Sequence, residues 1–87
     1  MNRPLLIICL LQQLDAVHPI GLRADSLATG ARAMGHPGTD STTVISLMAD
    51  CAEKQLVTSS VDAFDGTVKL YHRTETARVL LVNGGHI

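Results

Sequence analysis

The fold is decided by residues 56–72, which read LVTSSVDAFDGTVKLYH. Leu56 to Val61 is rich in β-branched and apolar residues, as strands are. Asp65-Gly66 is the strongest short-range hairpin signal in the chain, because this pair suits the tight turns that join two antiparallel strands. Thr67 to His72 then predicts a second strand, in which aliphatic residues occupy alternate positions. The segment therefore predicts a β-hairpin.

Three helices are predicted before this hairpin. The first runs from Arg3 to Val17, where apolar residues recur on more than one face, so it is either deeply buried or shares a dimer interface. It ends at His18-Pro19, because the residue before a proline avoids the α region. The second helix spans about Ala24 to Met34. The third begins at Asp40 or Ser41, both favoured N-cap residues, and ends near Lys54 or Gln55.

Shorter elements complete the predicted order. Ile20-Gly21-Leu22 is long enough only for an edge strand, and Gly35-His36-Pro37-Gly38 breaks the chain between the second and third helices. Thr74 is expected to cap a last helix from Glu75 to about Val82, which Gly84-Gly85 closes. The residues expected to face the core from the second and third helices are Leu27, Ala28, Ala31, Met34, Val44, Leu47, Met48 and Cys51.

Two segments resemble a known family. Residues 53–57, EKQLV, resemble the LEKKGLV exit from the third helix of winged-helix regulators, and residues 70–81, LYHRTETARVLL, resemble their W-R-L-T-x-x-G-R-x-x-L segment. Gln55 and Ala77 stand where that family often has Gly. The resemblance covers nearly the whole chain. It implies one α+β domain over residues 1–87, a winged helix-turn-helix with a three-helix core, a β-hairpin wing and a short C-terminal helix.

The N-terminal part resembles a narrower group. The pattern from Arg3-Pro4-Leu5-Leu6 to Gly21-Leu22-Arg23-Ala24-Asp25-Ser26-Leu27 is similar to small winged-helix proteins of Mu-like phages and prophages. This similarity implies a bacterial or phage origin.

The family resemblance implies duplex DNA as the partner, with the third helix in the major groove. The residues expected to meet bases or phosphates near its start are Ser41, Thr42, Thr43 and Ser46. The residues expected to add phosphate contacts are Arg23, Arg32, Lys54 and Lys69, with Arg73 as a further candidate. The interpretation is a DNA-binding transcriptional regulator.

Charge counts against DNA binding and keeps an alternative open. Seven Lys and Arg face eight Asp and Glu, which gives a net charge of −1, whereas dedicated DNA-binding domains usually carry a basic excess. Asp62 and Asp65 in the wing would repel phosphate. The alternative is a protein-interaction module or oligomeric adaptor without DNA binding. A homodimer through the first and last helices is expected under either reading, because the first helix and Val79-Leu80-Leu81-Val82 offer much apolar surface.

Other classes of function find little support. The four histidines and two cysteines lack the close ligand pairs of a zinc site, and no nucleophile, base and orienting group stand together, so no metal, cofactor or enzyme activity is expected. The apolar run after Arg3 is far shorter than the roughly 20 residues that span a bilayer. Cys9 and Cys51 are interpreted as buried reduced thiols, which is typical of cytoplasmic proteins.

Overall fold

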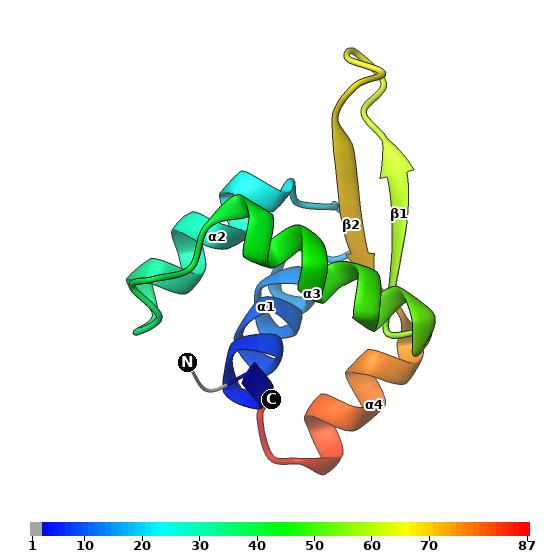
Figure 1. Ribbon diagram of the computed structural model, residues 1–87. Coiled ribbons are helices and arrows are strands. Elements are labelled where there is room, and N and C mark those ends of the chain that lie inside the picture. The colour runs from blue at the N-terminus through cyan, green and yellow to red at the C-terminus, as the bar shows by residue number, and fades with distance from the viewer. Residues whose placement is uncertain (1–2) are drawn as a thin grey trace.

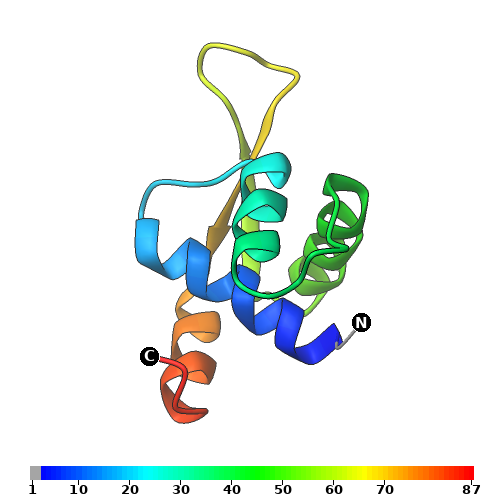
Figure 2. The same cartoon turned by 90° about the vertical axis from the view of Figure 1, so that its left-hand side faces the viewer.

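The computed structural model describes residues 3–87, which form helices and one two-stranded antiparallel sheet (Figure 1). The elements in chain order are α1 (Arg3–Val17), α2 (Ala24–Ala33), α3 (Ser41–Glu53), β1 (Val57–Val61), β2 (Lys69–Arg73) and α4 (Glu75–Asn83). The predicted order of the helices and of the two hairpin strands is confirmed, and each of their predicted boundaries lies within two residues of the observed one. The turn of the β1–β2 hairpin and helix α4 lie at opposite ends of the molecule (Figures 1 and 2).

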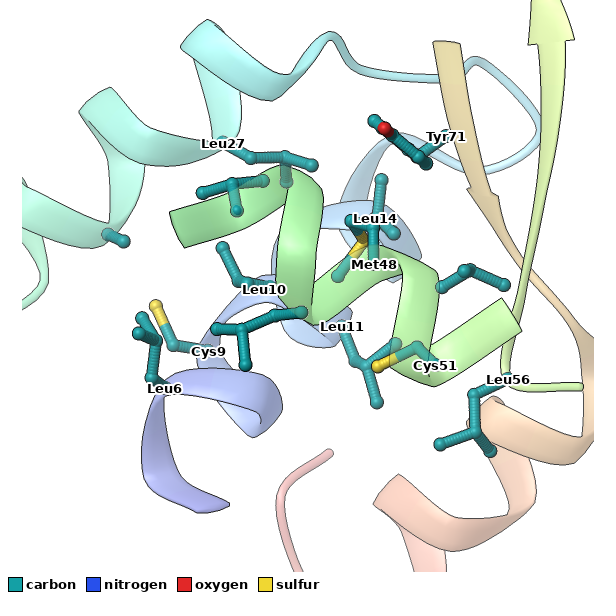
Figure 3. Close-up of a cluster of buried hydrophobic side chains, with 14 of the residues drawn as sticks. Leu6, Cys9, Leu10, Leu11, Leu14, Leu27, Met48, Cys51, Leu56 and Tyr71 are labelled. Carbon is teal, nitrogen blue, oxygen red and sulfur yellow. The ribbon is translucent and has the colours of Figure 1, made fainter. Parts of the chain in front are cut away.

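Helix α1 lies at the centre of the fold and packs against α2, β2 and α4. Its buried side chains are Leu6, Cys9, Leu10, Leu11 and Leu14. Figure 3 shows several of them together with side chains of α3 and β2 in one cluster. Burying one Leu side chain stabilises the fold by about 2 kcal/mol. Because α1 has neighbours on several sides, its wide apolar surface is explained by burial within one chain.

Helices α2 and α3 close the core over α1. Seven of their eight predicted core residues are buried: Leu27, Ala28, Ala31, Val44, Leu47, Met48 and Cys51. The eighth prediction, Met34, is wrong, since this residue is 53% exposed. The reason is that α2 ends at Ala33 and the chain reverses direction at Gly35. Gly35 has a φ of 103°, a conformation that glycine adopts at little cost. Met34 therefore lies at the edge of the core, where its sulfur contacts the Cys9 thiol at 3.6 Å.

The hairpin has a longer connection than the sequence predicts. Val57 pairs with Arg73 and Val61 with Lys69, and residues 62–68 join the two strands. The turn was expected over residues 62–66, but Asp65-Gly66 does not adopt the positive φ of a tight hairpin turn, since among the described residues only Gly35, Gln55 and Gly85 have positive φ. The connection is shaped instead by carboxylates: Asp62 accepts hydrogen bonds from the Phe64 and Asp65 amides, at 2.7 and 3.2 Å.

The predicted edge strand is reduced to a single bridge. The Leu22 amide donates to the Tyr71 carbonyl at 3.1 Å, and the Tyr71 amide donates to the Leu22 carbonyl at 2.9 Å. A Cβ at Gly21 would lie 2.7 Å from the His72 ring and 2.9 Å from the Tyr71 carbonyl. The close approach therefore needs glycine, and it ties the α1–α2 connection to β2.

Both predicted N-caps are confirmed. The Asp40 carboxylate accepts from the Thr43 amide at 2.8 Å at the start of α3. The Thr74 hydroxyl accepts from the Ala77 amide at 3.2 Å and donates to the Gln55 carbonyl at 2.7 Å, which links α4 to the end of α3. None of the helices within residues 3–87 has both the length and the apolar character needed to cross a membrane.

Candidate nucleic-acid interface

Helix α3 presents one continuous face to solvent. Its other face is buried against the core, which leaves six exposed residues: Thr42, Ile45, Ser46, Ala49, Ala52 and Glu53. Thr42 and Ser46 are therefore exposed as predicted, whereas Ser41 and Thr43 are half-buried at the margin. The sequence reasoning missed Ile45, which is 52% exposed. The sequence did contain a signal for this exposure, because Ile45 lies three residues after Thr42 and outside the stripe of α3 residues that was predicted to be buried.

The two predicted arginines at the ends of α2 already have partners in the fold. Arg32 donates to the Thr39 carbonyl at 2.8 Å and to the Thr29 hydroxyl at 3.2 Å, so its guanidinium is held beside the turn that leads into α3. Arg23 lies at the other end of α2 and pairs with Asp25 at 3.1 Å, with both side chains largely exposed. Exposed pairs of this kind contribute little to stability, so Arg23 can exchange its partner.

The two predicted lysines are exposed and lie apart from each other in the fold. Lys54 is the C-cap residue of α3, and Lys69 is the first residue of β2. Neither has a carboxylate within ion-pair distance among residues 3–87. Of the four predicted basic residues, only Arg32 is held at the N-terminal end of α3, so the structure does not gather them into one basic patch.

Arg73 was interpreted as a further phosphate contact, and this interpretation is wrong. Its side chain is 9% exposed, and Nε donates to the Asp15 carboxylate at 2.7 Å. Arg78 donates to the same carboxylate at 3.0 Å. Burial alone would raise the pKa of Asp15, but the hydrogen bonds and charges of Arg78 and Arg73 outweigh it and hold the pKa below its ordinary value. Arg73 thus joins α1 to β2 and is not available to phosphate.

Negative charge is fixed close to the candidate surface. The hydrogen bonds from Thr43 hold the pKa of Asp40 below its ordinary value, and those from Thr67 do the same for Asp65 in the hairpin connection. Both groups are therefore carboxylates at neutral pH. Phe64, fully exposed, lies between Asp62 and Asp65 in the sequence. Asp50 on α3 is paired with Arg3.

The His, Cys, Asp and Glu side chains of residues 3–87 nowhere gather in threes around a point that could hold a metal ion. Cys9 and Cys51 are free and buried, and burial raises the pKa of both thiols. At neutral pH both are protonated and lie within the apolar core.

No protein-family model matches the chain, and no curated protein matches it. Solved structures do. A mutant of MepR from S. aureus bound to an oligodeoxyribonucleotide is 23% identical over 93% of this chain and 52% of its own, with a TM-score of 0.74. The PcaV transcriptional regulator from Streptomyces coelicolor is 19% identical over 92% of this chain and 53% of its own, with a TM-score of 0.76. The fold is a winged helix.

A third match adds a DNA complex. The transcriptional repressor CouR, bound to a 23-mer DNA duplex, is 17% identical over 87% of this chain and 48% of its own, with a TM-score of 0.71. The present chain thus spans about half the length of these solved structures. In winged-helix terms, α2 and α3 form the helix-turn-helix and the β1–β2 hairpin is the wing.

Proposed function

We propose that this winged helix binds duplex DNA and acts as a transcriptional regulator rather than as an enzyme. The observation that carries the proposal is the exposed face of α3, the helix that enters the major groove in DNA-binding proteins of this architecture. Two structures of the same fold, a MepR mutant and CouR, are complexes with DNA. The resemblance of the N-terminal pattern supports a bacterial or phage origin, and the unpaired cysteines fit a cytoplasmic protein.

Phosphate contacts come from the four predicted basic residues in this proposal. Arg32 is best placed to hold a phosphate at the N-terminal end of α3, because its guanidinium is already oriented by the Thr39 carbonyl. Arg23, Lys54 and Lys69 are exposed and would reach phosphates on either side. With at most four such contacts and fixed carboxylates nearby, binding is expected to be modest and strongly salt-dependent.

The test measures binding to a random-sequence duplex at low and at physiological salt. The logarithm of the affinity should fall linearly with the logarithm of salt concentration, and Lys54→Ala or Lys69→Ala should each reduce that slope by about 1. Asn83→Asp is the matched control, because it makes the same change in net charge at the end of α4. Absence of binding at low salt would refute the proposal, and an equal loss in the control would refute the assignment of these lysines.

A second candidate function, a protein-interaction module, is favoured by one observation. Val79, Leu80 and Val82 of α4 are each about half-exposed, so this helix carries an apolar face that the core does not use. We propose that α4 forms a homodimer contact in which α1 takes a smaller part than expected, since Leu5 is the one large hydrophobic residue of α1 that is exposed. This contact is compatible with DNA binding through α3.

A further inference from the structure

Helix α3 has an unusual set of groups on the face that would meet base edges. Its sequence, residues 41–53, contains no Arg, Lys, Asn or Gln. The strongest hydrogen-bonded contacts in the major groove, Arg or Lys to guanine and Asn or Gln to adenine, are therefore not available to it. Thr42 and Ser46 offer hydroxyls, which bond to several bases without selecting one.

Methyl groups dominate the same face. Thr42, Ile45 and Ala49 follow one another at spacings of three and four residues, so their side chains lie in a row along the helix. Val44 and Met48, which flank Ile45 in the sequence, are fully buried and make the contacts of this part of α3 with the core. The core therefore does not need Ile45 for packing. Of the large aliphatic residues of α3, Ile45 alone is exposed, and it stands in the middle of this row.

The major groove offers one apolar feature to such a row, the C5 methyl group of thymine. We infer, on the basis of the DNA binding proposed above, that α3 selects thymine-containing sites through contacts of Ile45, Thr42 and Ala49 with thymine methyl groups. The ligand is then an A·T-rich duplex. Selection by these residues needs no hydrogen bond to a base. The phosphate contacts contribute to affinity for any duplex and do not influence which sequence is selected.

The test removes or adds the methyl group alone. Binding is measured at one low salt concentration to an A·T-rich duplex, to the same duplex with deoxyuridine in place of thymine, and to a G·C-rich duplex with cytosine or 5-methylcytosine. Deoxyuridine keeps every hydrogen-bonding group and every phosphate. Binding should weaken about four- to fifteenfold with deoxyuridine and strengthen with 5-methylcytosine, as expected for one or two buried methyl groups.

Ile45→Ala assigns the effect to α3. This variant should lose most of the discrimination between thymine and deoxyuridine while its salt dependence stays as in the wild type. Ile20→Ala is the matched control, because it makes the same truncation of an exposed Ile in the connection between α1 and α2. Circular dichroism checks that both variants are folded.

The outcomes separate this inference from the proposed function. Equal binding to the thymine and deoxyuridine duplexes would overturn thymine selection and leave DNA binding in place. Undiminished discrimination by Ile45→Ala would overturn the role given to this residue. Failure to bind any duplex at low salt would overturn both, and would direct attention to a protein partner for the same face.

Discussion

Gln55 takes a backbone conformation that suits glycine. Its φ is 60°, and it follows the C-cap of α3, where the Leu56 amide donates to the Cys51 carbonyl at 2.9 Å and the Gln55 amide to the Ala52 carbonyl at 3.0 Å. This pair of hydrogen bonds is the Schellman motif, which ends a helix with one left-handed residue. A side chain costs about 1 kcal/mol in that conformation. Glycine would take the same conformation at this position without that cost.

Gln55→Gly should stabilise the fold by about 0.5–1 kcal/mol, because the left-handed conformation is open to glycine without steric cost. The Gln55 carbonyl, which accepts from Thr74, is retained in the variant. Urea unfolding followed by circular dichroism measures the change as a higher midpoint. Gly35→Ala, at the equivalent position after α2, should shift the midpoint the other way. An unchanged or lower midpoint for Gln55→Gly would show that relief of strain at this residue does not stabilise the fold.

At the scale of elements, Asp15 connects three parts of the chain. It lies near the end of α1, and its carboxylate accepts from Arg73 of β2 at 2.7 Å and from Arg78 of α4 at 3.0 Å. The carboxylate and the Arg73 guanidinium are both largely buried. Removing one partner of such a cluster leaves charge buried without compensation, which is strongly unfavourable. The cluster therefore holds β2 and α4 in place against α1.

Asp15→Asn should lower the melting temperature at neutral pH, because it leaves two arginines without their shared carboxylate. The pKa of Asp15 is lowered in the folded protein, so its contribution is complete above the ordinary pKa of an Asp and is lost as pH falls through the lowered value. The difference between wild type and variant should therefore shrink in strong acid. Thermal melts across this pH range measure it.

Asp25→Asn is the control for this prediction, since Asp25 pairs with Arg23 at an exposed site. Its melting temperature should stay close to that of the wild type, as is usual for exposed ion pairs. A difference between Asp15→Asn and wild type that persists unchanged in strong acid would contradict the role assigned to the Asp15 carboxylate.

For the whole molecule, the wing and α4 point in opposite directions from the helical core (Figures 1 and 2). A dimer contact on α4 would leave the tip of the wing free. Leu81 carries the packing of α4 into the core, whereas Leu80 beside it is 53% exposed. Association through α4 can therefore be tested without disturbing the fold.

Leu80→Asp should convert a dimer into a monomer and leave the melting temperature of the monomer nearly unchanged. Sedimentation at several concentrations gives the mass in solution. Ile20→Asp is the matched control, because it places the same charge on an exposed apolar side chain outside α4. A wild type that sediments as a monomer at every concentration, or a Leu80→Asp variant that remains a dimer, would exclude α4 as the contact.

The sequence by itself determined the order of the elements and most of their ends. The helices follow from apolar periodicity, and two of their starts from Asp40 and Thr74, because caps and periodicity act between residues a few positions apart. The choice of Thr42 and Ser46 as exposed residues of α3 follows from the same periodicity.

Only the tertiary structure decided which charged side chains are available at the surface and which expected core residue stays exposed. Arg73 was expected at the surface and is instead buried against Asp15, 58 positions away in the sequence. Met34 was expected in the core and is instead exposed, because α2 ends at Ala33 and the chain turns away from the core. Such outcomes depend on contacts between distant segments, and local sequence patterns carry no record of which side chains meet there.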